Sequence, residues 1–348
     1  MVVLSLFSGC AKPLLTCPRA LRVPEPPAPN QHPAAVLFAT DRLREQSNDL
    51  AFNGDLNLSA TRVTYGVKCA DPERTGRSEC AKPIWWQGAM PSELDKDQFL
   101  AEIAAAKSDV VLFVHGFNYS FQEALDITVR IVERAGTTAT PVAYTWPSQA
   151  KVSAYGLDYD RNEWTIDHLK NLIQDLVNAL PQGAVLNVVA QSMGNRAALW
   201  ALSRLSLPKD RLGQLIMIAP DVDTEVFKDL ISRSGPFQRK TLYVSEHDRA
   251  LQASRLLRSG VSRAGDAQKG YLVVKEMDTI DASPLKGGFS GHSVYDYSQL
   301  MFNDLGATLA NKPVTSRELQ ACTVNSIERF NAEHGTQLPC VVYRLPPN

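Results

Sequence analysis

The sequence predicts an α/β fold built on a mostly parallel, doubly wound sheet with helices on both faces. Strand-like and helix-like segments alternate along the chain from residue 34 onward. The run Val110–Val114 is a continuous stretch of β-branched, aromatic and other apolar residues, as expected of a strand buried on both faces. Between Leu169 and Leu180, apolar residues recur three and four positions apart, as on the buried face of a helix. Such alternation specifies a parallel sheet, because right-handed crossovers place the connecting helices on its faces.

The remaining elements follow from the same two patterns and from the residues that interrupt them. Pro147 ends one strand-like run and Pro181 ends the clearest helix, since proline lacks the backbone N–H that both structures use. We expect the first two strands to be antiparallel. The expected strands cover residues 34–39, 62–67, 110–114, 141–146, 185–190, 215–219, 242–244 and 271–276. The expected helices cover residues 121–135, 169–180, 195–205, 225–232, 250–257 and 294–309.

Length and composition exclude several classes of function. The 348 residues are 44% hydrophobic and 21% charged, which is ordinary for a globular protein. The net charge of −1 gives no general attraction to nucleic acid. No apolar run approaches the roughly 20 residues that span a bilayer, and no cysteine or histidine spacing indicates zinc. We expect one domain over residues 34–312, followed by a C-terminal extension over residues 313–348.

The first 33 residues predict a targeting segment followed by an extended tether. Residues 1–9 are apolar and then small, and Cys10 follows directly, which resembles the lipobox of a bacterial lipoprotein signal. The segment departs from that pattern because its apolar stretch is short and no basic residues precede it. Six prolines between residues 18 and 33 are typical of an extended spacer. We expect lipidation at Cys10 and a place in the cell envelope or periplasm, with a cytoplasmic protein as the alternative.

The other cysteines predict stapled segments near both ends of the chain. Cys69 and Cys80 flank a polar stretch, and Cys322 and Cys340 bracket the C-terminal extension. A disulfide within each pair would stabilise segments that have few core residues. Free thiols in a cytosolic protein are the alternative, since connectivity cannot be deduced from sequence alone.

In an open parallel sheet, ligands bind outside the carboxyl ends of the strands, so the residues there carry the functional argument. Ser192 follows the strand ending at Ala190 and precedes a helix, which is the setting of a nucleophile on a sharp turn. Gly194 would let the helix pack closely, and the Met193 N–H could donate to an oxyanion. Ala190 stands where the usual pattern has glycine. A serine that caps an ordinary helix is the alternative.

A second strand end supplies a candidate oxyanion loop. His115, Gly116, Phe117 and Asn118 follow the strand ending at Val114. Hydrolases with such a sheet place their second oxyanion donor at this point, here the N–H of Phe117. His115, Gly116 and Asn118 would support the loop, Asn118 through a side-chain hydrogen bond. An ordinary strand-to-helix turn is the alternative.

Two further strand ends supply an acid and a histidine. Asp248 follows the strand ending at Val244, and its position after the serine suits the acid that orients an imidazole. Asp221 and Asp223, one strand earlier, are rival acids. His292 lies near the chain's end on a glycine-rich loop and completes the order serine, aspartate, histidine. The agreement of four strand ends, rather than any single motif, predicts a catalytic triad.

Several of these segments together resemble a bacterial family of α/β-hydrolases catalogued as a domain of unknown function. The matching segments are residues 113–118, 144–148, 191–196, 219–223, 245–251 and 291–293. The family usually has histidine where Gln191 stands and asparagine where His247 stands. The resemblance implies the α/β-hydrolase fold and a serine-hydrolase triad, but it implies little about the substrate.

These residues predict a serine hydrolase that cleaves ester bonds in the manner of a carboxylesterase. His292, oriented by Asp248, would take the proton of Ser192 as the serine attacks, while Phe117 and Met193 hold the oxyanion. No metal or cofactor is required, and the expected partner is a small ester or lipid-like substrate. Lipases, thioesterases, amidases and acyltransferases use the same triad. A non-catalytic envelope binding protein that keeps the fold is the alternative from another class.

The segments around the site bear on the substrate. Only 20 residues separate Asp221 from the next strand, so no large cap domain is inserted there, which favours an open, esterase-like site. The segment from Trp146 to residue 164 is expected to be a loop. Trp146, Tyr155 and Tyr159 are candidates for an aromatic pocket wall, with ordinary surface packing as the alternative.

Overall fold

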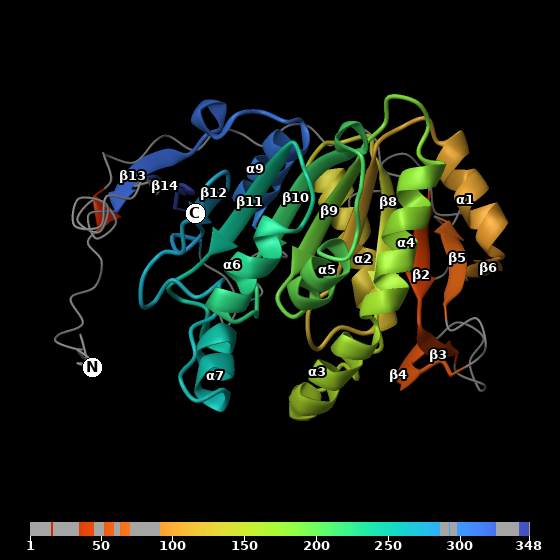
Figure 1. Ribbon diagram of the computed structural model, residues 1–348, viewed down its shortest axis with the longest axis horizontal. Helices are drawn as coiled ribbons and strands as arrows, with labels where there is room; N and C mark the ends of the chain where they lie inside the picture. Colours follow the sequence, from red (N-terminus) through yellow and green to blue (C-terminus); the bar gives the residue numbers. More distant parts are fainter. Residues whose placement is uncertain are drawn as a thin grey trace.

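A large mixed sheet organises the part of the chain that the structure describes (Figure 1). The structure is a computed structural model, and it describes residues 15–16, 35–44, 52–58, 63–69, 91–285, 292, 298–324 and 341–347. Within these ranges the main sheet has 12 strands in the order β1-β13-β14-β12-β11-β10-β9-β7-β8-β2-β5-β6, and β3 pairs separately with β4. The predicted α/β fold is therefore confirmed.

The bounds of the elements are as follows. The strands are β1 (Leu15–Thr16), β2 (Ala35–Thr40), β3 (Arg42–Arg44), β4 (Phe52–Leu56), β5 (Thr64–Cys69), β6 (Ser92–Leu94), β7 (Val110–Val114), β8 (Thr140–Thr145), β9 (Leu186–Gln191), β10 (Leu212–Ile218), β11 (Arg239–Val244), β12 (Asp278–Asp281), β13 (Gln320–Val324) and β14 (Val341–Arg344). The helices are α1 (Lys96–Ala105), α2 (Phe121–Arg134), α3 (Tyr155–Trp164), α4 (Ile166–Ala179), α5 (Gly194–Leu202), α6 (Thr224–Ser232), α7 (Arg249–Leu257) and α9 (Gln299–Leu309). Short 3-10 turns lie at Val152–Ala154, Lys209–Arg211 and Val314–Ser316.

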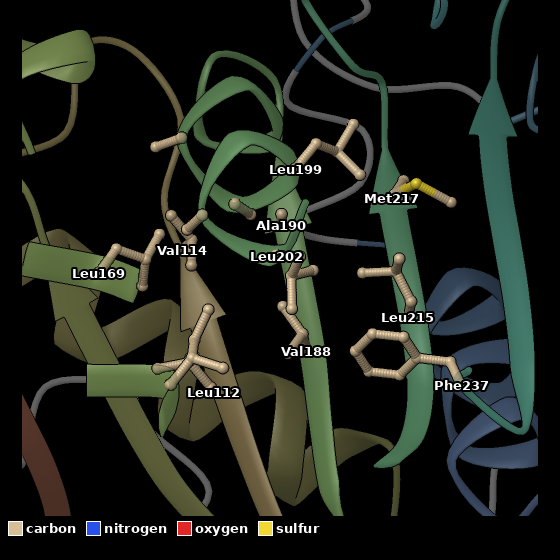
Figure 2. Packing of buried hydrophobic residues seen from close by; sticks show 14 of the residues in the cluster. Leu112, Val114, Leu169, Val188, Ala190, Leu199, Leu202, Leu215, Met217 and Phe237 are labelled. Carbon is tan, nitrogen blue, oxygen red and sulfur yellow. The ribbon is translucent and has the colours of Figure 1, made fainter. Parts of the chain in front are cut away.

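The strands from β2 to β14 in the middle of the sheet run parallel, and helices cover both faces of this region. Alternate residues of one strand enter different cores: Leu112 of β7 packs in the cluster that includes α4 and α5, whereas Phe113 packs in the cluster that includes α2 and α9. Figure 2 shows the first of these clusters around β7, β9, β10 and α5. Burial on both faces explains why β7 is apolar without interruption.

Two predicted segments differ from the structure. The strand expected over residues 271–276 is irregular, and β12 begins at Asp278 instead. Leu272 and its neighbours pack against the core without joining the ladder, so an apolar run alone did not locate the strand. The segment expected as a loop between residues 146 and 164 contains α3, which projects with α7 beyond the sheet (Figure 1).

The two ends of the described chain join the main sheet. β2 and β5 are antiparallel neighbours, as predicted for the first two strands. β13 and β14, from the expected C-terminal extension, continue the sheet next to β12, and β1 pairs with β13. Cys322 is buried and disulfide-bonded. Cys10, Cys80 and Cys340 lie outside the described residues, and Cys69 ends β5, so the predicted pairings and the lipidation stay predictions. None of the described helices is long and apolar enough to cross a membrane.

Two helical glycines should respond in opposite ways to alanine. A Cβ on Gly306 of α9 would lie 2.2 Å from the carbonyl oxygen of Ala135 at the end of α2, whereas a Cβ on Gly156 of α3 would meet nothing within 4 Å. We expect Gly306→Ala to lower the free energy of unfolding by about 1–3 kcal/mol through overpacking. The matched variant Gly156→Ala should leave it unchanged or raise it by up to about 1 kcal/mol. Urea unfolding of both variants checks this, and equal effects would contradict it.

Candidate active site

Ser192 lies on a tight turn between β9 and α5, at the carboxyl edge of the sheet. Its φ is +51°, a left-handed conformation that costs a non-glycine residue on the order of 1–3 kcal/mol. Neighbouring backbone holds this turn: the Ser192 N–H donates to the carbonyl of Ile218 at 2.8 Å, and the N–H of Asp221 donates to the Ser192 carbonyl at 3.2 Å. A strained serine between a strand and a helix is the geometry of a nucleophile elbow.

The start of α5 leaves backbone donors beside this serine. Met193 precedes the helix, and no side chain caps it. Ser192 is therefore not the ordinary helix cap that the sequence left open. Among the described residues, no hydrogen bond uses the N–H of Met193 or that of Phe117. Both groups are thus available to an oxyanion.

Gly194 brings α5 close to the neighbouring strand. A Cβ at this position would lie 2.4 Å from the carbonyl oxygen of His115 and 2.5 Å from that of Val114. Only glycine permits such an approach. The turn at Ser192 therefore lies directly against the loop that follows β7.

His292 and Asp248 form a hydrogen-bonded pair. The imidazole Nδ1 of His292 donates to Oδ2 of Asp248 at 2.6 Å. Asp248 has no exposed area, and the other oxygen of its carboxylate accepts the N–H of Leu251 at 3.0 Å, which caps α7. The His292 side chain keeps 20% of its surface exposed, so a substrate can reach it. A buried carboxylate that anchors a partly exposed imidazole is the arrangement that a general base needs.

The rival acids have other partners. The two oxygens of Asp221 accept the hydroxyls of Tyr155 and Ser254, each at 2.6 Å, and Arg263 forms an ion pair with it. Asp223 caps α6 by accepting two backbone N–H groups. The structure thus brings Asp248, and neither rival, into contact with His292.

The loop after β7 packs directly against Ser192. A Cβ on Gly116 would lie 2.9 Å from Cβ of Ser192, so glycine is required at this position too. Asn118 has a φ of +64°, and its backbone N–H donates to Oγ of Ser148 at 3.1 Å. The backbone of Asn118 thus supports the loop, and no hydrogen bond of its side chain is formed among the described residues.

His115 supports the loop from inside the protein. It has no exposed area, and its ring stacks on Trp146 with centroids 4.9 Å apart and planes 11° from parallel. The indole N–H of Trp146 donates to the carbonyl of His115 at 2.7 Å. Burial, together with the nearby Arg42 guanidinium, lowers the pKa of His115 well below 6.5. His115 is therefore neutral at pH 7 and is no candidate for the general base.

The three aromatic residues proposed as a pocket wall take different places. Trp146 is completely buried, so the expectation that it lines a pocket is wrong: it lies beneath the loop. Tyr155 is partly exposed and packs edge-on against Phe117, with centroids 5.2 Å apart. Tyr159 lies between two guanidinium groups, with Arg196 at 4.1 Å and Arg258 at 3.8 Å from its ring centroid.

Sequence reasoning missed two polar side chains beside the loop. Gln191 accepts the hydroxyl of Tyr119 at 2.9 Å, which ties the nucleophile turn to the loop. Arg42 is buried and reaches the carbonyl of Tyr119 at 2.8 Å. An arginine two residues after a buried strand was the available signal for Arg42, but nothing in the sequence shows which loop it meets. Among the described residues, no cluster of His, Cys, Asp and Glu could hold a metal ion.

Comparison with known proteins assigns the fold family. The family described as "Alpha/beta hydrolase of unknown function (DUF900)" matches residues 93–301. This range contains β7 to β12 and therefore every residue of the candidate triad. No curated protein shows a significant match to the chain.

The buried His115 predicts a pH dependence of stability. Because its folded pKa lies well below 6.5, the unfolded chain binds a proton below pH 6.5 that the folded chain excludes. The contribution of His115 to the free energy of unfolding is therefore fully present above its unfolded-state pKa. This contribution declines as the pH falls below that pKa, by at most about 1.4 kcal/mol per pH unit. Urea unfolding at about pH 8 and about pH 5 should show a smaller change in the free energy of unfolding in His115→Asn than in the wild type. Equal pH effects in the two proteins would contradict this.

Proposed function

The chain belongs to this family of α/β-hydrolases of unknown function, and within it we propose that the protein is a serine hydrolase that cleaves carboxylic esters. One observation carries the proposal. The imidazole of His292 is anchored by the buried carboxylate of Asp248, at the edge of the sheet where Ser192 occupies a strained turn. A binding protein would have no need of this combination.

Strand register supports a contact between the serine and the histidine. Gln191 of β9 pairs with Ile218 of β10, which pairs with Tyr243 of β11. The residues after β9 and β11 are thus two strand spacings apart, roughly 10 Å. An imidazole with a hydrogen bond at each nitrogen bridges a gap of this size. Asp248 holds Nδ1 of His292, and we propose that Nε2 is the atom that takes the proton of Ser192.

The proposed reaction has two halves. His292 Nε2 takes the hydroxyl proton as Ser192 Oγ attacks the acyl carbon, and Asp248 stabilises the imidazolium. The N–H groups of Met193 and Phe117 donate to the negative oxygen of the tetrahedral intermediate. The imidazolium then protonates the departing alkoxide, which leaves an acyl group on Ser192. A water molecule, deprotonated by His292, attacks this acyl group and releases the acid.

The surroundings of the site favour an ester with a small or lipid-like acyl group. Between Asp221 and β11 the chain forms α6 without an inserted cap domain. The partly exposed Phe117 and Tyr155 offer an aromatic surface next to the oxyanion loop. A small or lipid-like acyl group on this surface is the partner that we propose.

Labelling of Ser192 is the first test. We expect an alkyl fluorophosphonate to label the wild type once per chain and to leave Ser192→Ala unlabelled, since the variant lacks the attacking hydroxyl. Hydrolysis of p-nitrophenyl esters of graded chain length should fall to background in the same variant. Activity that survives in Ser192→Ala would contradict the mechanism. A folded wild type that neither labels nor hydrolyses would favour the binding-protein alternative.

Removal of a single charge at Asp248 or at Asp223 tests which of the two residues is the acid. Asparagine can cap a helix, so Asp248→Asn and Asp223→Asn should both keep their helices while each loses one charge. We expect kcat to fall on the order of 10³–10⁴-fold in Asp248→Asn, because the imidazolium loses its partner. Asp223→Asn should keep nearly all activity. Steady-state ester hydrolysis measures both variants, and a larger loss in Asp223→Asn would overturn the assignment.

We further propose that the protein acts at the cell envelope, attached through a lipid on Cys10 and stapled by disulfides within the pairs Cys69–Cys80 and Cys322–Cys340. The lipobox-like sequence and the disulfide-bonded Cys322 support this. Intact-mass analysis of the protein from a bacterial membrane fraction checks it. A chain that keeps Met1 and carries no lipid would contradict the attachment.

A further inference from the structure

Arg42 is a buried cation that forms no ion pair with a carboxylate among the described residues, although the charges of Asp41 and Asp158 partly offset the effect of burial on its pKa. It is 1% exposed and lies in β3, outside the residues that the family match covers. Burial lowers its pKa to about 10, so the guanidinium stays charged at neutral pH. Its closest partners are two carbonyl oxygens, those of Ser148 and Tyr119, each at 2.8 Å. Burying a charge in this way is costly, which calls for a reason beyond packing.

The same guanidinium faces the ring of His115. Nη2 of Arg42 lies 3.4 Å from Nε2 of His115, and Nδ1 of His115 lies 2.8 Å from the carbonyl oxygen of Gly116. A guanidinium only donates, so it requires a bare, accepting Nε2. The proton of the neutral ring then lies on Nδ1, where it donates to Gly116.

One contact opposes this tautomer. Nε2 of His115 also lies 3.2 Å from the carbonyl oxygen of Trp146, which would favour a proton on Nε2. With the proton on Nε2, the bare Nδ1 and the Gly116 carbonyl oxygen would be two acceptors only 2.8 Å apart. The N–H at Nε2 and the N–H of Arg42 would then be two donors that point at each other. The Nδ1–H tautomer satisfies two of the three contacts and the alternative satisfies one. The contact with Arg42 therefore favours the tautomer that carries its proton on Nδ1.

The His115 tautomer fixes the direction of an oxyanion donor. The peptide bond between Gly116 and Phe117 is trans, so its C=O and N–H point in opposite directions. While Nδ1–H of His115 holds the Gly116 carbonyl inward, the N–H of Phe117 points away from the interior. Arg42 also holds the far end of the loop through the carbonyl of Tyr119.

We propose that Arg42 is a positioning residue for the oxyanion hole, which sets the tautomer of His115 and through it the orientation of the Gly116–Phe117 peptide. This inference rests on the proposed function, because the orientation matters only if Phe117 stabilises an oxyanion. Its structural part, the tautomer, can be measured without any activity.

The tautomer is read by ¹⁵N NMR of the full chain with labelled histidine, and His115→Asn identifies the signal. We expect a protonated Nδ1 and a bare Nε2 in the wild type at neutral pH, and a changed pattern in Arg42→Lys. A bare Nδ1 in the wild type, or a pattern unchanged in Arg42→Lys, overturns the inference. Because this readout needs no substrate, it stays decisive even if the protein hydrolyses no ester.

Kinetics tests the positioning role. A lysine keeps the charge but cannot reach the Ser148 carbonyl, the Tyr119 carbonyl and the ring together. We expect Arg42→Lys to lower kcat roughly 10–100-fold with little change in KM, since the oxyanion donor acts in the transition state. Affinity for a trifluoromethyl ketone, which forms a tetrahedral adduct, should fall in proportion to kcat/KM.

Two matched variants separate positioning from a loss of structure. Arg317→Lys changes another buried arginine, which is bonded to Asp304 on α9, and it should lose stability but keep kcat. In a His115→Asn background, where the amide N–H can donate to Gly116 without a tautomer to control, Arg42→Lys should cost far less than in the wild type. Equal kcat losses in Arg42→Lys and Arg317→Lys, or additive losses with His115→Asn, would show a merely structural role.

Discussion

The parallel pairing of β7, β9, β10 and β11 is the constraint on which the candidate site depends. Each of these strands is buried on both faces, so its register is fixed by two cores at once. Their carboxyl ends therefore reach one edge in a fixed order: the loop at Gly116, the turn at Ser192, Asp221, and then Asp248. A slip of one residue in any strand would turn its apolar side chains to the wrong face and remove its functional residue from the site.

Close packing at this edge leaves little freedom to the polar groups. Gly194 and Gly116 allow backbone and side-chain atoms from β7, β9 and α5 to meet at distances that no Cβ would tolerate. Asp248 uses one oxygen to cap α7 and the other to hold His292, so the orientation of the imidazole is coupled to the start of a helix. Such shared contacts make the site rigid before substrate arrives, which favours charge stabilisation in the transition state.

Sequence patterns predicted the central elements and the triad candidates, because both rest on local periodicity and on chain order. They failed where the information is not local. The strand β12 reads Asp-Thr-Ile-Asp, and its carboxylate at Asp281 is buried against Arg344 from the far end of the chain. Asp223 and Asp248 both cap helices after strands, so only the fold shows which of them meets His292. Trp146 was predicted to line a pocket because its contacts with His115, 31 positions away, are not visible in the sequence.

Arg42 belongs to a part of the sheet that the family match does not cover. The residues matched by the family include the proposed nucleophile, acid and histidine, whereas Arg42 comes from the segment that precedes them. It lies where β2 ends, and β2 pairs in parallel with β8, whose own end leads into Trp146 and Ser148. The parallel pairing of β2 with β8 therefore also places the guanidinium of Arg42 behind the candidate oxyanion loop. Without this strand, His115 would keep only its two carbonyl contacts, the Gly116 oxygen at Nδ1 and the Trp146 oxygen at Nε2, and these favour opposite tautomers.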